Sequence, residues 1–170
     1  GSVIFFGDSI TQGLNVAAVT HPAINYGIGM DTSLGLLKRI PQYESLTKAS
    51  LFVVAIGVND LIRTSRDDAG ILENYRLILD SLPEGVPVII QAIFPVDERL
   101  VTVGFNKRIL GLNASLKALA ERRKLVFIDL YEEVANPDGN LKAGLHTGDG
   151  IHLSAVGYKL WIDVLKQQLS

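Results

Sequence analysis

Short apolar runs alternate along this chain with longer stretches whose apolar residues recur at helical spacing. The short runs lack the alternation of apolar and polar residues that marks a strand with one face in water. Continuous apolar runs are instead typical of strands that are buried on both faces of a parallel sheet. This pattern predicts five strands, at Val3–Phe6, Ala23–Ile28, Leu51–Ile56, Val86–Ile93 and Leu125–Ile128.

The longer stretches carry apolar residues three and four positions apart, as amphipathic helices do. They predict helices over Ile71–Leu82, Phe105–Leu119 and Val156–Leu165, and another that contains Leu36, Leu37 and Ile40. Ser154 is the expected N-cap of the last helix, and Asp31 or Thr32 that of the Leu36 helix. Strands that alternate with helices indicate a three-layer α/β/α sandwich with right-handed crossovers. We predict a five-stranded parallel sheet of the flavodoxin-like order 2-1-3-4-5.

A chain of 170 residues, 48% of them hydrophobic, is long enough to bury one sizeable core. It contains no repeat, low-complexity tract or linker, so we expect residues 1–170 to form a single domain. The 16 basic and 18 acidic residues leave a net charge of −2, without the basic surface that a nucleic-acid partner or a polybasic membrane anchor requires. The longest strongly apolar run, Leu51–Val58, is too short for stable membrane insertion.

The chain has no cysteine, which excludes disulfides, thiolate metal sites and cysteine nucleophiles. No group of His, Asp and Glu has the spacing of a metal site, so we expect neither a metal nor another cofactor. We interpret Gly1 and Ser2 as the remnant of an expression tag. The protein is therefore expected to be soluble, and either cytoplasmic or exported with its native N-terminus removed. Its oligomeric state is left open.

Ligands of open α/β sheets bind outside the carboxyl ends of the strands, where the strand order reverses. In the order 2-1-3-4-5 that point lies between the first and third strands. The residues that follow these strands are Gly7-Asp8-Ser9-Ile10-Thr11 and Gly57-Val58-Asn59-Asp60. Both segments are polar and both begin with glycine, so the functional site is expected there.

A serine hydroxyl is a poor nucleophile at neutral pH and needs a base within hydrogen-bond reach, and the base needs an acidic partner. Of the three histidines, His152 lies in a glycine-rich turn, with Asp149 three residues upstream and able to fold back toward it. Ser9, directly after the first strand, is the best-placed nucleophile. His21 and His146 are expected to be surface or loop residues rather than ligands.

Each of these signals also has an ordinary structural interpretation. A serine after a strand is usually a turn or cap residue, an Asp-x-x-His segment is often a surface loop, and Asn59-Asp60 can form an Asx-turn. Ser9–Gly13 after the first strand can also be interpreted as a phosphate-binding loop of a flavodoxin-like module that binds flavin mononucleotide. That alternative leaves Asn59, Asp149 and His152 without a role.

Four segments together resemble the sequence blocks of the GDSL, or SGNH, hydrolases. They are Gly7-Asp8-Ser9, Asn25–Thr32, Gly57-Val58-Asn59-Asp60 and Asp149-Gly150-Ile151-His152, in the family's order and spacing. The resemblance is nearest to the branches that contain platelet-activating-factor acetylhydrolases and carbohydrate O-acetylesterases. It implies a serine esterase with a catalytic triad.

The resemblance also implies a role for each matched position. Ser9 is the nucleophile, His152 the general base and then acid, and Asp149 the carboxylate that orients it. The oxyanion hole combines the Ser9 N–H, the Asn59 carboxamide and a backbone N–H from the second block. Asp8, Thr11 and Asp60 are expected to brace the turns around these groups.

The second block departs from the family pattern, because Met30 stands where glycine is usual and Gly29 precedes it. Only a backbone N–H is needed there, so we assign the Met30 amide to the hole, with the Gly29 amide as the alternative. A methionine side chain at this position projects at the mouth of the site, and it is strained if the backbone has a positive φ.

Short loops around Ser9 predict an open, shallow site, which favours a short acyl group, acetyl above all, on a large alcohol such as a carbohydrate or on a small molecule. Leu61, Ile62, Phe94 and Ile151 are the expected substrate rim. An apolar shelf for a longer acyl chain could instead be formed by Met30 together with Leu61, Ile62 and Phe94. The alternative within the enzyme class is therefore a lysophospholipase or thioesterase.

Overall fold

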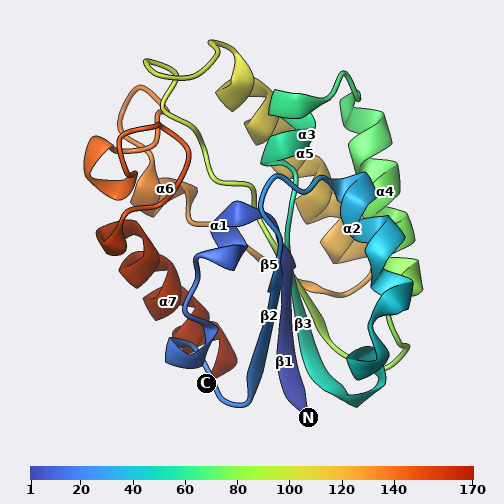
Figure 1. Cartoon of the computed structure of the whole chain (residues 1–170). Helices are drawn as coiled ribbons and strands as arrows, with labels where there is room; N and C mark the ends of the chain where they lie inside the picture. The colour runs from blue at the N-terminus through green and yellow to red at the C-terminus, as the bar shows by residue number, and fades with distance from the viewer.

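The structure is a computed structural model that describes residues 1–170. Its centre is a sheet of five parallel strands in the order β2-β1-β3-β4-β5, which confirms the predicted fold and strand order (Figure 1). The strands are β1 (Ser2–Gly7), β2 (Ala23–Gly27), β3 (Ala49–Ala55), β4 (Val88–Gln91) and β5 (Val126–Ile128).

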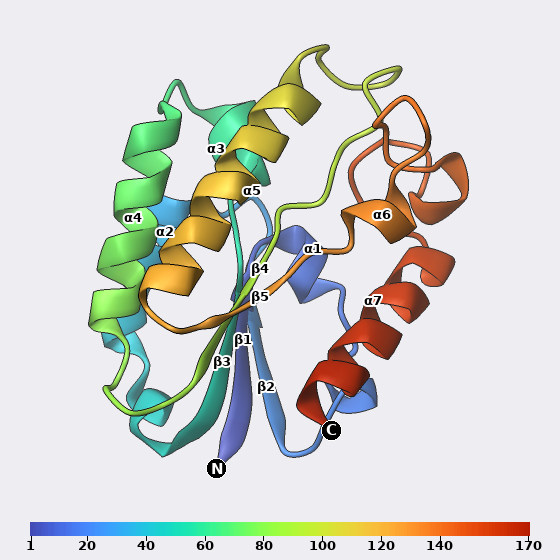
Figure 2. The same ribbon diagram turned by 180° about the vertical axis from the view of Figure 1, so that it is seen from behind.

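Helices cover both faces of the sheet, so the molecule has three layers. On one face lie α1 (Ser9–Gln12), α6 (Tyr131–Val134) and α7 (Ala155–Leu169); on the other lie α2 (Ser33–Arg39), α3 (Val58–Arg63), α4 (Asp68–Ser81) and α5 (Phe105–Arg122) (Figures 1 and 2). Four 3₁₀ turns complete the chain, at Val16–Ala18, Ile40–Gln42, Glu44–Lys48 and Ala143–Leu145.

Two of the predicted helix starts are confirmed by their caps. The Ser154 hydroxyl accepts from the Gly157 N–H at the start of α7, and the Thr32 hydroxyl accepts from the Gly35 N–H at the start of α2, each at 3.2 Å. Of the two candidates for the second cap, Thr32 rather than Asp31 therefore does the capping. No helix in the molecule combines the length and apolarity that crossing a bilayer demands.

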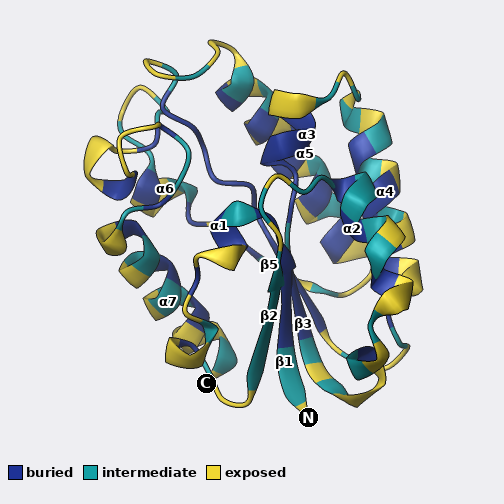
Figure 3. Ribbon diagram, viewed as in Figure 1, coloured by how far each residue is buried: buried dark blue, intermediate teal, exposed yellow.

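The core lies on both sides of β1 and β3, two of the three inner strands of the sheet (Figure 3). Ile4, Phe5 and Phe6 are consecutive, and all three are fully buried, which is the property that their uninterrupted apolar run predicted. Trp161 of α7 is also fully buried, and its indole N–H donates to Gln91 Oε1 of β4 at 2.9 Å. The last helix is thereby fixed to the sheet.

Three strands end at the same level of the sheet, because Gly7 of β1 is paired with Gly27 of β2 and with Ala55 of β3. The segments that leave these ends therefore meet above the sheet. Two of them begin helices that the sequence did not predict, α1 and α3, of four and six residues. Helices this short contain too few residues to show a periodic pattern.

Candidate active site

The turn from β1 to α1 places Ser9 at the carboxyl edge of the sheet (Figure 1). Gly7 closes the strand, and a side chain at that position would collide with Thr11 and with the backbone of β3. Asp8 caps α1, its Oδ1 accepting from the Ile10 N–H at 3.0 Å. The glycine permits close packing and the aspartate holds the turn, so Ser9 has a defined position.

Three predicted site residues come together although they are distant in the sequence. Ser9 Oγ lies 2.8 Å from His152 Nε2, and His152 Nδ1 lies 2.5 Å from Asp149 Oδ2. Asp149 turns back on the histidine because its Oδ1 accepts from the N–H groups of Ile151 and His152, at 2.8 and 2.9 Å. One short segment thus brings both an imidazole and a carboxylate to the Ser9 hydroxyl.

The Asp149 carboxyl is ionised in the folded protein. Partial burial alone would raise its pKa, but hydrogen bonds from the His152 ring and from the backbone N–H groups of Ile151 and His152 lower the pKa to about 2. A carboxylate at this position holds the Nδ1–H tautomer of His152, which leaves Nε2 free to accept the Ser9 proton.

Asn59, in the first turn of α3, presents a fixed and nearly buried carboxamide beside Ser9. Its Nδ2 donates to the Asp31 carbonyl at 3.0 Å, and its Oδ1 accepts from Arg63 Nε at 3.2 Å. These partners assign the nitrogen and the oxygen of the Asn59 carboxamide, since only the NH₂ can donate to a carbonyl. Nδ2 has a second hydrogen with which to bind an oxyanion.

The second block runs past Ser9, and Met30 has the left-handed backbone (φ 68°) that would strain a side chain. Its side chain is 62% exposed and projects at the mouth of the site. Gly29 lies close to Ser9, since a Cβ added there would be 3.9 Å from Ser9 Cβ. The N–H groups of Gly29 and Met30 have no protein acceptor, so both are available as donors.

Arg39 of α2 holds the second block in place, a role that the sequence analysis missed. Its guanidinium donates to the carbonyl oxygens of Gly7 and Tyr26, and its Nε donates to the Asp31 carboxylate at 2.7 Å. The ends of β1 and β2 are therefore tied to the residue whose carbonyl orients Asn59. Nothing local marks this arginine, because its partner Gly7 is 32 positions away in sequence.

Asp60 braces the same region from α3, as expected. The side chain is fully buried and accepts from the Ser33 N–H, from the Ser33 hydroxyl and from Arg66, at 2.8, 2.7 and 3.0 Å. Because Ser33 opens α2, this carboxylate fixes α2 to α3 on the side of the sheet where Asn59 lies.

An open cleft of about 190 Å³ leads to the serine. Its walls combine the reactive groups with apolar side chains and one cation, namely Ser9, Gly29, Met30, Val58, Asn59, Ile62, Arg63, Ile151 and His152. Ile62 and Ile151 line it as expected of rim residues, and Arg63 is an addition.

The other two expected rim residues, Leu61 and Phe94, do not line this cleft, so that part of the prediction was wrong. Leu61 is 5% exposed and belongs to the core, because successive helical residues point about 100° apart and Ile62 takes the outward direction. Phe94 packs edge-on against Trp161, with ring centroids 5.1 Å apart. Both side chains are hydrophobic because they fill the interior.

His146 is a loop residue, as expected, but its burial and its partners were not predicted. It lies between the last 3₁₀ turn and the Asp149 segment, but its ring is buried and Nε2 is 3.1 Å from Asp97 Oδ2. The available signal was its position, six residues before His152 in a segment rich in glycine. His21, in contrast, is exposed as expected.

Asp8 gives the site a measurable pH dependence of stability. Burial raises its pKa to about 6, against the hydrogen bond from the Ile10 N–H, which lowers it. Between the pKa of the unfolded chain, about 4, and this value, the folded protein holds a proton that the unfolded chain has lost. The contribution of Asp8 to the free energy of unfolding therefore falls as the pH rises from about 4 through 6.

We expect Asp8→Asn, which stays neutral and keeps an oxygen for the cap, to be more stable than the wild type by about 3 kcal/mol near pH 8 and by almost nothing near pH 4. Urea unfolding at the two pH values measures this. Asp163→Asn, on the exposed side of α7, is the matched control. If Asp8→Asn and the wild type differ in free energy of unfolding by the same amount at both pH values, the assignment of the pH dependence to Asp8 is contradicted.

A family model described as "GDSL-like Lipase/Acylhydrolase family" matches residues 5–160. A search of curated proteins returns no match. Among solved structures, the lipase/acylhydrolase from Enterococcus faecalis is 25% identical, with a TM-score of 0.85, covering 99% of this chain and 94% of that one. A GDSL-like lipase from Bacteroides thetaiotaomicron is 24% identical, with a TM-score of 0.85 and coverage of 99% and 87%. The acetyl xylan esterase AlAXEase is 22% identical, with a TM-score of 0.82 and full coverage of both chains.

Proposed function

Since the chain belongs to the GDSL-like lipase/acylhydrolase family and is thus a hydrolase of ester bonds, we propose that it removes short acyl groups, acetyl above all, through an acyl-enzyme on Ser9. The observation that carries the proposal is the Ser9 Oγ to His152 Nε2 contact of 2.8 Å at the base of a small cleft. Asp149 completes the arrangement that activates a serine hydroxyl.

In the first half of the proposed reaction, Ser9 Oγ attacks the acyl carbon and His152 Nε2 takes the hydroxyl proton. The tetrahedral oxyanion is bound by the Ser9 N–H, the Asn59 Nδ2–H and an amide of Gly29 or Met30. The C–O bond of the ester then breaks, and His152 gives its proton to the departing alkoxide. In the second half, water repeats the attack on the acyl-enzyme and releases the acid and free Ser9.

Asn59→Ala tests the oxyanion role. We expect kcat to fall by about 10²–10³ with little change in KM, because the lost donor acts only on charge that develops in the transition state. Steady-state kinetics on p-nitrophenyl acetate measure both constants. A rise in KM with kcat unchanged would show that Asn59 binds the ground state instead.

The dimensions of the cleft support a short acyl group. Its volume of about 190 Å³ is below the roughly 300–1,000 Å³ of pockets that enclose drug-sized ligands. Met30 narrows the mouth, and Ile62 and Ile151 supply a small apolar wall. The alternative of a longer chain relied on a shelf that included Leu61 and Phe94, and both are in the core.

The open side of the cleft leaves room for a large alcohol, and we extend the proposal to acetylated carbohydrates. AlAXEase, which shares the fold over its full length, is an acetyl xylan esterase. The flavin alternative is not favoured, because Ser9–Gln12 form a helical turn whose serine hydroxyl already contacts His152.

A series of p-nitrophenyl esters, with acetylated xylooligosaccharides beside it, tests the acyl preference. We expect kcat/KM to fall by more than about 10-fold from acetate to octanoate. Met30→Gly removes the side chain at the mouth of the cleft and should make the fall in kcat/KM from acetate to octanoate smaller. A rate that rises toward octanoate would contradict the proposal and favour the lysophospholipase or thioesterase alternative.

A further inference from the structure

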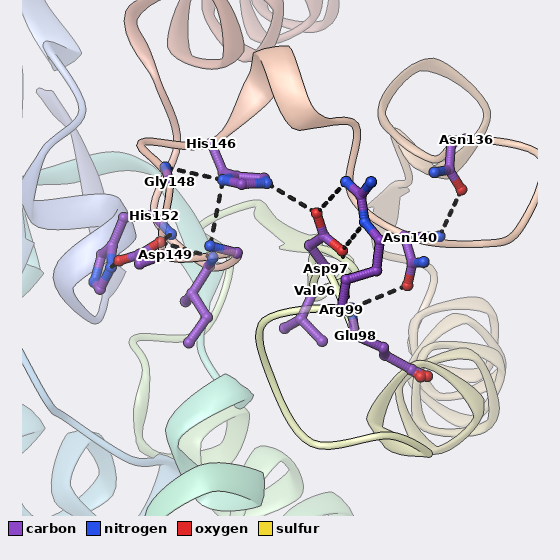
Figure 4. Close-up of polar contacts among 12 residues, drawn as sticks. Val96, Asp97, Glu98, Arg99, Asn136, Asn140, His146, Gly148, Asp149 and His152 are labelled. Carbon is purple, nitrogen blue, oxygen red and sulfur yellow. Dashed lines mark hydrogen bonds and ion pairs between the residues drawn. The ribbon is translucent and has the colours of Figure 1, made fainter.

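Both nitrogens of the buried His146 ring have partners, and these partners belong to the segments on either side of it (Figure 4). Nδ1 accepts from the N–H groups of Gly148 and Gly150, at 3.0 and 3.3 Å. Nε2 lies 3.1 Å from Asp97 Oδ2. The ring thus joins the segment that carries Asp149 to the loop after β4.

These partners select one tautomer of the ring. Backbone N–H groups only donate, so Nδ1 must be unprotonated, and the ring proton must be on Nε2, where it is donated to Asp97. Asp97 is fully buried, and hydrogen bonds from Arg99 hold the pKa of its carboxyl well below its usual range. A permanent carboxylate therefore faces Nε2–H.

The two glycines that donate to the ring flank Asp149. Both have positive φ values, 112° at Gly148 and 82° at Gly150, a conformation that glycine adopts readily and other residues rarely do. The Gly150 carbonyl also accepts a hydrogen bond from the Asp97 N–H at 2.9 Å. The backbone on both sides of Asp149 is thus attached to Asp97 and His146.

The backbone around His152 is hydrogen-bonded to the same segment. Thr147 N–H donates to the His152 carbonyl at 2.9 Å, and His146 is bridged to Leu153 in antiparallel fashion, so residues 146–153 form a closed loop around the imidazole of His146. The side chains of Asp149 and His152 are themselves about half exposed.

We propose that Asp97 and His146 are positioning residues for the hydrolytic site: Asp97 selects the Nε2–H tautomer of His146, and His146 Nδ1 then holds the two glycine amides that aim Asp149 at His152. The inference rests on the proposed function and adds to it a second Asp–His pair, 49 residues apart in sequence, that never touches the substrate.

Substitutions at Asp97 and His146 test separately the hydrogen bond between His146 and Asp97 and the hydrogen bonds from the glycine amides to His146. Asp97→Asn turns an NH₂ toward Nε2, which favours the opposite tautomer and sets Nδ1–H against the glycine amides. His146→Asn keeps an acceptor near Nδ1 but no longer reaches Asp97, and His146→Leu removes both functions. His21→Asn, the same change at an exposed histidine, is the matched control.

On p-nitrophenyl acetate, with active sites counted by an organofluorophosphonate, we expect Asp97→Asn and His146→Leu to lower kcat by about 10- to 100-fold with KM within about twofold. His146→Asn should retain at least about fivefold more activity than His146→Leu. His21→Asn should match the wild type. A merely structural role would lower the melting temperature and the number of titrated sites but leave kcat per site unchanged, and that result would overturn the proposal.

A proton NMR experiment gives a readout that does not depend on turnover. We expect the bond between His152 Nδ1–H and Asp149 to give a downfield resonance, which should weaken or shift in Asp97→Asn and stay in place in His21→Asn. An unchanged resonance in folded Asp97→Asn and His146→Asn would refute the positioning role, even if His146→Leu does not fold. If the wild-type protein neither hydrolyses esters nor reacts with the fluorophosphonate, the proposed function fails, and the resonance still decides the positioning role.

Discussion

Ser9→Ala lowers kcat on p-nitrophenyl acetate by about 10⁴-fold or more and leaves the fold intact, if the hydroxyl is the nucleophile. The change removes the atom proposed to form the acyl-enzyme, together with one partly buried hydrogen bond to His152. That bond contributes about 1 kcal/mol to the free energy of unfolding, so the melting temperature should change little.

Stopped-flow or steady-state rates, compared with thermal unfolding of the same samples, measure both effects. Ser115→Ala, in α5 on the opposite face of the sheet from α1, is the matched control and should keep the wild-type rate. Retention of more than a few per cent of the activity by folded Ser9→Ala would mean that water or another side chain attacks the ester.

Asp149→Asn should retain less than about 1% of the wild-type activity. Asparagine keeps an oxygen for the N–H groups of Ile151 and His152, so the turn can persist. Its NH₂, however, faces His152 Nδ1, which favours the tautomer with a proton on Nε2. That nitrogen then donates to Ser9 and no longer accepts its proton.

The same kinetic assay checks this expectation, with Asp163→Asn on the exposed side of α7 as the control for a lost surface charge. If Asp149→Asn hydrolyses p-nitrophenyl acetate at nearly the wild-type rate, a different carboxylate orients the imidazole. Asp8 is then the next to be tested. Its side chain is buried and lies close enough to His152 for a charge on the histidine to lower the pKa of the Asp8 carboxyl.

The features that local sequence encodes were predictable. Uninterrupted apolar runs predicted where the five strands lie, and the strand order placed the Ser9 and Asn59 segments at one edge of the sheet. Asp149 lies three residues from His152, so the hydrogen bond between them is a local one that the spacing suggested.

Some features that depend on distant partners were not predictable. Arg39 holds Gly7, and His146 holds Asp97, through contacts that no pattern within either segment records. Leu61 and Phe94 were misplaced for a related reason: an apolar side chain near a site can face the cleft or the core, and only the direction of the helix or loop decides. The supporting contacts of Arg39, Asp97 and His146 therefore emerged only from the three-dimensional structure.

Stoichiometric labelling by an organofluorophosphonate tests most directly whether Ser9 is an activated nucleophile. We expect mass spectrometry to find one adduct per chain, located on Ser9, and we expect its rate of formation to fall sharply in His152→Ala. An unlabelled wild-type protein, or an adduct that forms equally fast without the imidazole, would contradict the account.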